Sequence, residues 1–232
     1  IINAKNKRCK IMKILKPYVE VPDIDGVQIM KNIEKAGRTC YKSHSTDEES
    51  YKRFLNNIIM SGHESVIEHE KVSIRILTDR GSMWDITRHR HASFSIESTR
   101  WCNYSKEKFE QEIKFIEPFY LLEDKDGFEI WKKTMEEIEK NYFKLSKMGY
   151  KADVCRMLLP ASLATEIAMT ANLREWRHIL KLRTAKNVHP HVRQFTIPLL
   201  LYFKERMPEI FNDIEYDKEF DNKNYAELKI IK

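Results

Sequence analysis

The chain has 232 residues, of which 42% are hydrophobic and 11% aromatic, and no Gly/Ser/Pro-rich linker divides it, so we expect a single domain over residues 1–232 with a substantial core. No apolar run approaches the roughly 20 residues that a membrane span needs, and no apolar segment follows the N-terminal cations, so we expect neither a membrane partner nor a secretory signal. The formal net charge is +6, but six of the 41 basic residues precede the first acid, Glu20. The remaining basic residues equal the 35 acids in number, so the body of the chain is electrically balanced. This balance argues against nucleic acid as a partner.

The two ends differ from the body of the chain. Residues 1–11 are expected to be an N-terminal extension, because MKILKPYVEV from Met12 resembles a natural start followed by a strand. Residues 214–232 are highly charged and are expected to form a polar, partly disordered tail. The cysteines form no CxxC pair, so we expect free thiols in a reducing cytoplasm; they are Cys9, Cys40, Cys102 and Cys155.

The first third of the chain predicts a strand and two helices. Residues 13–21 alternate weakly around Pro17, which favours an edge strand. Asp23 or Asp25 is expected to cap a helix that ends at Gly37. A capping-box pattern, either Ser45 with Glu48 or Thr46 with Glu49, is expected to begin the next helix. The expected apolar faces of the two helices are Val27, Met30 and Ile33, and then Tyr51, Phe54, Leu55, Ile58 and Ile59.

The middle of the chain predicts two strands and one short helix. Ser61-Gly62 ends the preceding helix, a polar turn follows at 63–65, and 70–78 alternates as a half-buried strand. Asp79-Arg80-Gly81 is expected to be a turn, after which Ser82 caps a helix to about Arg90. The chain is then expected to be irregular or extended by Phe94, and residues 112–117 predict another strand.

The last part predicts mostly helices. A long amphipathic helix is expected from about Gly127 to Gly149, and a short one at 152–159 before Pro160. Leu163, Thr165, Ile167 and Met169 indicate one face of a strand. Asn172 is expected to cap a helix that buries Leu173, Trp176, Ile179 and Leu180, and Pro190 to occupy the first turn of the last long helix. The buried face of that last helix is expected to contain Val192, Phe195, Leu199 and Phe203.

Residues 88–100, RHRHASFSIESTR, are the most unusual stretch. Three arginines alternate with histidines and hydroxyl groups, and the planar donors of arginine suit phosphates and heterocycle edges. Interleaved apolar residues, among them Phe94 and Trp101, indicate that the stretch is packed. An anion or nucleotide site and a salt-bridged structural segment both fit these residues.

Other kinds of site have less support. The histidine pairs His63/His69, His89/His91 and His189/His191 lack a matching acid or cysteine, so we expect no metal. Neither a GxGxxG nor a phosphate-loop pattern occurs, which argues against a Rossmann or P-loop site. The hydroxyl of Ser98 could contact a ligand, serve the structure or act as a nucleophile, and the sequence leaves these open.

Arg88-His89-Arg90, seven intervening residues and Ser98 resemble the signature of the flavin-dependent thymidylate synthases. Further blocks resemble that family in the same order, and together they span about residues 36 to 205. They are GHESVIEH at 62–69, CRMLLP at 155–160 and TANLREWRHILKLR at 170–183. Four ordered blocks are more specific than one short motif.

The resemblance implies an α/β (α+β) fold in which helices surround a central, mostly antiparallel sheet. It implies transfer of the methylene group of 5,10-methylenetetrahydrofolate to carbon 5 of dUMP, with hydride from reduced FAD and with NADPH as the reductant of the flavin. It also implies a homotetramer whose active sites are built from several subunits.

The family's functional residues fall on two sets of positions in this sequence. The implied FAD contacts are Ser65, Arg88, His89, Arg90, Ile96, Asn172, Leu173, Arg174 and His178. The implied nucleotide contacts are Asp85, Ile86, Thr87, Arg88, Ile96, Glu97, Ser98, Thr99, Arg100, Arg156 and Arg183. Arg183 also matches the arginine that promotes ionisation of the pyrimidine ring and is the implied catalytic residue; a cation there favours the electron-rich, deprotonated ring.

Two positions depart from the family pattern. Ile96 and Asp85 both stand where Gln or Glu is usual. Either the site tolerates the loss of a polar contact at Ile96, or the neighbouring Glu97 replaces it; we favour the second explanation. A related enzyme acting on another pyrimidine nucleotide such as UMP is the nearest alternative, and a basic nucleic-acid-binding module is the alternative from another class.

Overall fold

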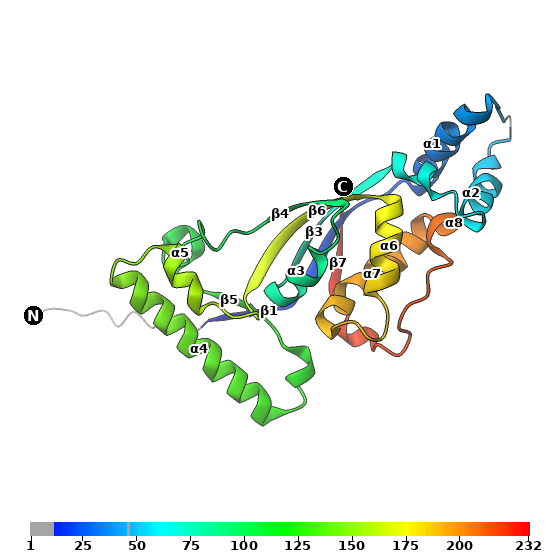
Figure 1. Ribbon diagram of the computed structural model, residues 1–232. Helices are drawn as coiled ribbons and strands as arrows, with labels where there is room; N and C mark the ends of the chain where they lie inside the picture. Colours follow the sequence, from blue (N-terminus) through cyan, green and yellow to red (C-terminus); the bar gives the residue numbers. More distant parts are fainter. Residues whose placement is uncertain (1–11, 46) are drawn as a thin grey trace, which may run out of the picture. The chain divides into compact units, whose positions relative to one another are not determined.

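The structure is a computed structural model that describes residues 12–45 and 47–232 (Figure 1). The expected extension at 1–11 and the Thr46 alternative of the capping box lie outside these residues. The described chain divides into two compact units. Residues 17–96 and 166–232 form the large unit, and residues 12–16 and 97–165 form the small unit. The single domain expected over the whole chain stays a prediction.

The large unit contains a five-stranded sheet with the strand order β4-β6-β3-β2-β7. Its strands are β2 (Tyr18–Pro22), β3 (Lys71–Asp79), β4 (Ala92–Ile96), β6 (Ala164–Asn172) and β7 (Glu227–Ile231). The pairs β2–β3 and β4–β6 are antiparallel, and β2–β7 is parallel. A sheet flanked by helices confirms the expected α/β fold class.

Helices cover the sheet and extend beyond it in the large unit (Figure 1). They are α1 (Gly26–Arg38), α2 (Ser50–Met60), α3 (Arg80–Ile86), α6 (Leu173–Arg183), α7 (Pro190–Arg206) and α8 (Pro208–Phe211). Short 3-10 turns join them, namely η1 (Thr39–Tyr41), η2 (Glu64–His69) and η6 (Asn222–Asn224). Helix α7 packs against β2, β3 and β7, and α1 packs beside α2. Their shared core includes Val19, Ile76, Trp176 and Phe203, all at most 2% exposed.

Two boundary predictions for the first helices of the large unit were wrong for local reasons. Asp25 caps α1 by accepting a hydrogen bond from the Gln28 amide (2.9 Å), but the helix continues through Gly37 to Arg38. A Cβ at Gly37 would lie 2.4 Å from the Phe54 ring, so this glycine permits close packing rather than ending the helix. The Ser45/Glu48 capping box does not form, because α2 begins only at Ser50.

The predicted turn at 79–81 is also wrong. Helix α3 begins at Arg80, and its cap is Asp79, which accepts from both the amide and the hydroxyl of Ser82 at 2.8 Å. The helix ends at Ile86, four residues before the expected end at Arg90. The chain therefore leaves α3 in time for His89 to turn inward.

The predicted edge strand at 13–21 is divided and is not an edge in the large unit. Pro17 separates β1 (Lys13–Leu15) from β2, and β2 lies between β3 and β7. The polar tail that was expected to be partly disordered instead supplies β7, whose pairing with β2 runs from Glu227 to Ile231. The prediction relied on the high charge of this segment. A charged segment can still form a strand, because the strand needs only backbone hydrogen bonds and a few apolar contacts.

The small unit is built on a long helix and a two-stranded parallel sheet, β1–β5. Its elements are β5 (Lys114–Ile116), α4 (Lys125–Lys147), α5 (Ala152–Cys155), η3 (Glu107–Phe109), η4 (Phe119–Leu121) and η5 (Arg156–Leu158). Its core contains Tyr142, Ile113 and Phe115, which are fully buried. No helix in the described part of the chain is both long and apolar enough to cross a membrane.

Candidate active site

Helix α6 carries much of the site. Its cap is Asn172, whose side-chain oxygen accepts a hydrogen bond from the Glu175 amide (2.8 Å), as expected. Trp176 fixes the helix to the sheet by donating its indole N–H to the Val72 carbonyl (3.0 Å). The predicted buried face is confirmed, and Arg174 and His178 lie together on the exposed side.

A groove of about 720 Å³ runs along the exposed side of α6. It brings together three residues of the implied FAD set, Asn172, Arg174 and His178. His91, named above only in a histidine pair, also lines it, and the other lining residues, which the sequence analysis did not single out, are Glu64, Glu68, Glu175, Arg177, Lys181 and Ile214. Arg174 pairs with Glu68 of η2 at 2.6 Å, so this cation already has a carboxylate partner.

Arg183, at the last turn of α6, forms a second cluster with two implied site residues. Its Nε donates to Nε2 of His89 (2.9 Å), and its NH2 donates to the Asp85 carbonyl (2.7 Å). The Asp85 carboxylate lies 3.9 Å from NH1. These contacts fix the guanidinium on two edges, and the arginine remains partly exposed at 19% of its side chain.

His89 is neutral in this cluster. Burial lowers its pKa to about 4, and the Arg183 charge and the neighbouring His178 add to the effect. Because Nε2 accepts from Arg183, the proton belongs on Nδ1. That nitrogen faces a carboxylate oxygen of Glu175 at 3.6 Å, and both side chains are almost completely buried, at 5% and 9% exposed.

Arg177 is a structural cation that the sequence did not reveal. Its guanidinium contacts both oxygens of Asp213 at 2.6 and 2.7 Å, Glu64 at 3.1 Å and the Ile210 carbonyl. It thereby ties α6 to η2 and to the segment after α8. Arg174 and Arg177 are three residues apart on the same helix. Their side chains therefore have different surroundings, and only Arg177 is buried.

The remaining FAD-type residues of the large unit do not line this groove. Ser65 is exposed in η2, and Arg88 and Arg90 are exposed on either side of buried His89. Leu173 is fully buried.

Two implied nucleotide contacts of the large unit serve the structure of α3. Ile86 is 1% exposed in the core. Thr87 donates its hydroxyl to the Met83 carbonyl (3.0 Å), which completes the end of α3.

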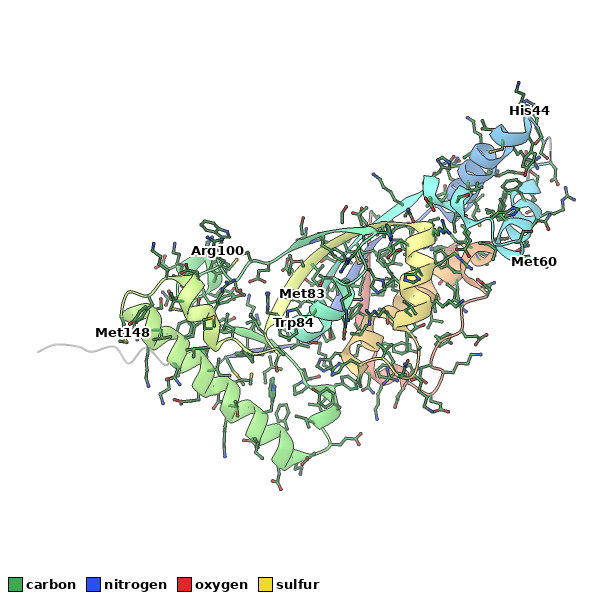
Figure 2. The ribbon with its side chains drawn as sticks, in the orientation of Figure 1. His44, Met60, Met83, Trp84, Arg100 and Met148 are labelled. Atoms are coloured by element: carbon green, nitrogen blue, oxygen red, sulfur yellow. The ribbon has the colours of Figure 1, made fainter. Side chains whose placement is uncertain are left out.

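Five implied nucleotide contacts belong to the small unit, and they are Glu97, Ser98, Thr99, Arg100 and Arg156. The Ser98 carbonyl accepts from the amides of Trp101 and Cys102, which forms a turn. Arg100, labelled in Figure 2, is exposed beside the Trp101 ring at 5.6 Å. Arg156 is exposed at the start of η5, whereas Thr99 is 7% exposed.

The two departures from the family pattern have structural partners. Ile96 packs against the core of the large unit and pairs with Ile167 across β4 and β6, so an apolar side chain fits there. The Asp85 carbonyl accepts a hydrogen bond from Arg183, and the Asp85 carboxylate lies 3.9 Å from the same guanidinium. Glu97 accepts a hydrogen bond from the Tyr104 hydroxyl (2.7 Å), and its replacement of a polar ligand contact stays a prediction.

Comparisons with known proteins identify the family of this chain. The profile of the family described as "Thymidylate synthase complementing protein" matches residues 27–209. A flavin-dependent thymidylate synthase of Pyrococcus abyssi is 31% identical over 155 residues, which are 66% of this chain and 63% of that protein, so the aligned part is just under two thirds of the relative's length. A flavin-dependent thymidylate synthase of Corynebacterium glutamicum is 24% identical over 223 residues, which are 88% of this chain and 86% of that protein.

A solved structure supports the fold. A UMP/dUMP methylase, PolB from Streptomyces cacaoi, bound with 5-Br UMP, superposes with a TM-score of 0.71 at 20% identity, over 87% of this chain and 95% of the other. Together with the profile match over most of the chain, these findings place the sequence in one family. The chain belongs to the thymidylate synthase complementing proteins, the flavin-dependent thymidylate synthases.

Proposed function

We propose that this protein makes dTMP by placing the methylene group of 5,10-methylenetetrahydrofolate on carbon 5 of dUMP and reducing it with hydride from reduced FAD, which NADPH regenerates. The observation that carries the proposal is the fixed guanidinium of Arg183, held by His89 and Asp85 at the end of α6. Two of the three residues come from the signature segment around 88–100 and its flank, and the third from the last family block.

The groove along α6 fits part of a flavin dinucleotide. Its volume of about 720 Å³ lies within the range of ligand pockets. Its cations Arg174 and Lys181 suit a diphosphate, and His178 offers a ring face and a polar edge. Bound FAD, once reduced, would supply the hydride of the reaction.

Arg183 has the chemistry to activate the pyrimidine. Two of its five N–H donors are occupied by His89 and the Asp85 carbonyl, which leaves donors on NH1 and NH2 for a ligand. A guanidinium beside ring nitrogen 3 favours loss of the ring proton and raises the electron density at carbon 5. Because His89 is neutral, it orients the Arg183 guanidinium without placing a second positive charge beside it.

Outside the groove, the proposed nucleotide contacts include Arg88 in the large unit and, separately, Arg100 and Arg156 in the small unit. Arg88, Arg100 and Arg156 are exposed and carry planar donors that suit phosphate. Ser98 and Thr99 add hydroxyl groups of the type that phosphate oxygens accept from. Ser65, Arg88, His89, Arg90 and Leu173 complete the proposed FAD contacts, and Asp85, Ile86, Thr87, Ile96 and Glu97 the proposed dUMP contacts.

A homotetramer with shared active sites belongs to the same proposal. Trp84, labelled in Figure 2, is 58% exposed and Leu182, next to Arg183, is 48% exposed, so apolar surface adjoins the Arg183 cluster. Burial of these side chains against another subunit would also exclude water from the cluster. The cytoplasmic location expected from the free thiols remains part of the proposal.

UMP is the second candidate substrate. The structural neighbour from Streptomyces cacaoi is described as a UMP/dUMP methylase, and the shorter side chain of Asp85 changes a position that the resemblance assigns to nucleotide contact. The two nucleotides differ only by the ribose 2′-hydroxyl, so one hydrogen-bonding group decides between them.

The test begins with the absorption spectrum of the purified protein, where a flavin spectrum is expected. The protein is then incubated with dUMP, 5,10-methylenetetrahydrofolate and NADPH, and dTMP is measured by chromatography. Omission of any one component is expected to abolish product, and UMP in place of dUMP is expected to give much less. A folded protein that binds FAD but forms no methylated nucleotide from either substrate would overturn the proposal.

A further inference from the structure

A second, cationic pocket lies in the large unit where α1 ends. It has a volume of about 620 Å³ and shares no lining residue with the groove along α6. Its lining residues are Lys31, Glu34, Lys35, Arg38, Thr39, Lys42, Ser43, His44 and Ser45. Four cations therefore face one carboxylate, and three hydroxyl groups lie among them. His44, labelled in Figure 2, is at the outer tip of this part of the unit.

Arg38 is a fixed cation at the base of this pocket. Its Nε donates to Glu34 at 2.9 Å, its NH2 lies 2.8 Å from the same oxygen, and its guanidinium lies 5.5 Å from the centre of the Phe54 ring. Ser50 donates to that carboxylate oxygen at 2.7 Å, which fixes Glu34 in turn. Ser43 accepts a longer hydrogen bond from NH1 (3.4 Å). An arginine held on one side in this way presents its remaining donors in a defined direction.

Lys42 has a backbone conformation that lysine seldom adopts. Its φ of 45° and ψ of 40° are left-handed, at the position after a helix end where glycine or asparagine is usual. The turn itself is closed by backbone bonds, from the Lys42 amide to the Thr39 carbonyl and from Ser43 to Arg38. A glycine would adopt the same turn with less backbone strain. The geometry of the turn therefore does not explain why this residue is a lysine.

The helix end accounts for only half of the positive charge. Cations are favoured in the last turn of a helix, which explains Lys35 and Arg38. Lys31 lies earlier in α1, four residues before Lys35, where two like charges repel each other. Lys42 lies beyond the helix. Both add positive charge to a concave surface that already has an excess of it, and such a surface attracts a multiply charged anion.

We propose that this pocket binds the phosphate group of a ligand, with Arg38 as the fixed donor and Lys31, Lys35 and Lys42 as the surrounding cations. Phosphate oxygens accept hydrogen bonds from guanidinium and ammonium groups and from the hydroxyls of Ser43 and Ser45, whereas the Thr39 hydroxyl already donates to the Lys35 carbonyl at 3.2 Å. The phosphate belongs either to a free diphosphate or to a dinucleotide such as NADPH, and these sources share the chemistry that the pocket recognises.

The test measures hydrogen exchange of the backbone amides of residues 39–45 in the full chain with inorganic pyrophosphate. This local readout separates the pocket from other cationic surfaces. Protection is expected to rise to saturation with pyrophosphate and to weaken when the salt concentration rises, because the cations are exposed. Protection by NADPH at a concentration where NADH gives none would assign the phosphate to the dinucleotide's 2′ position, and protection by pyrophosphate alone would assign it to a free diphosphate.

Two variants and one control decide whether these residues form the site. Lys42→Gly removes a cation while it relaxes the left-handed backbone, so weaker binding cannot be ascribed to a damaged fold. Lys35→Glu reverses a charge without a change of backbone. We expect an about threefold to fivefold higher half-saturating pyrophosphate concentration for the first and a larger change for the second.

The control is Lys133→Ala, which removes an exposed lysine from α4 and is expected to leave the half-saturating concentration unchanged. Absence of saturable protection at 39–45 in the unaltered protein would overturn the proposal. Equal protection in the unaltered protein and in both variants would overturn it as well.

Discussion

At the scale of single residues, the state of His89 determines how Arg183 is presented. A protonated imidazole could not accept from Arg183 Nε, and it would place a second positive charge 2.9 Å from the guanidinium. Burial keeps the pKa of His89 near 4, so the neutral ring is the state at neutral pH. The ring therefore acts as a hydrogen-bond acceptor that fixes the direction of the Arg183 guanidinium.

The first prediction concerns Arg183→Lys. Lysine keeps the charge, but its single ammonium group cannot contact His89, the Asp85 carbonyl and a pyrimidine ring together. If Arg183 acts on charge that develops at the ring, the loss belongs to the transition state. We expect kcat for dTMP formation to fall by about 100-fold or more while KM for dUMP changes by less than about threefold.

The matched control is Arg53→Lys on α2. The Arg53 side chain is 76% exposed, and its ion pair with Asp47 is long, at 4.0 Å. It is expected to leave both kinetic constants unchanged. An Arg183→Lys enzyme with normal kcat and a raised KM would assign Arg183 to ground-state binding instead.

The second prediction concerns the pH dependence of stability. Because the folded-state pKa of His89 is about 4 and the unfolded value is about 6.5, the unfolded chain takes up this proton first. The contribution is complete above pH 6.5 and is lost as the pH falls toward 4, with a limit of about 3 kcal/mol. His89→Asn, which does not titrate, should remove this part of the slope.

Urea unfolding at pH 7, 6, 5 and 4 measures the difference between the two proteins. The variant is expected to be less stable at pH 7, since a buried ring is lost, and the gap should close as the pH falls. A gap that stays constant from pH 7 to pH 4 would mean that His89 does not take part in the linkage.

At the scale of elements, Asp79 shows how one side chain can begin a helix and join it to another. It caps α3 through the Ser82 amide and contacts Nδ1 of His191 in α7 at 2.7 Å. Burial alone would raise the pKa of Asp79, but the hydrogen bonds from His191 and Ser82 outweigh it, and the pKa is lowered. Both side chains of the pair are only 6% exposed.

The third prediction compares two helix caps. Asp79→Ala removes a cap and leaves His191 buried without its carboxylate, so we expect a loss of about 3–5 kcal/mol in the free energy of unfolding. Asp25→Ala removes the exposed cap of α1 and should cost about 1 kcal/mol. Denaturant unfolding followed by circular dichroism gives both values, and equal losses would show that the Asp79–His191 contact adds nothing.

The same elements show what the sequence could and could not predict. The start and the buried face of helix α6 were predicted correctly, because the Asn172 cap and the apolar periodicity agree. The α3 start was missed because Asp79 and Ser82 are both good caps, and the buried partner His191 lies 112 positions away in sequence. β2 was placed at an edge on account of Pro17, although that proline ends β1 and leaves the pairing of β2 intact.

The candidate site was predictable where residues match the family motifs and not where they act through partners. Arg183, His89 and Asp85 were all named from the resemblance, and the structure brings them together. Glu175 and Arg177 were missed, because a charged residue on a helix is expected in solvent until the packing around it is known. Their burial at 8% each depends on η2 and the segment after α8, which the local pattern does not contain.

At the scale of the whole molecule, the implied FAD contacts run from Ser65 to His178 without a compact nucleotide-binding motif. The groove along α6 holds only three of them, and exposed Trp84 and Leu182 add apolar surface in the same unit. A groove that provides only a few of the contacts to a ligand binds it weakly, because those few contacts barely offset the entropic cost of ordering the ligand. Retention of FAD should therefore depend on assembly of several chains.

The fourth prediction is that FAD and subunits dissociate together. On serial dilution of the flavin-bound protein, the sedimentation coefficient should fall over the same concentration range in which FAD fluorescence rises, because free flavin is no longer quenched by the protein. Addition of excess FAD should shift both transitions to lower protein concentration, since a ligand that binds only the assembled form stabilises it by mass action. A monomer that retains FAD with unchanged affinity would show that one chain provides the whole flavin site, and the exposed apolar residues would then need another explanation.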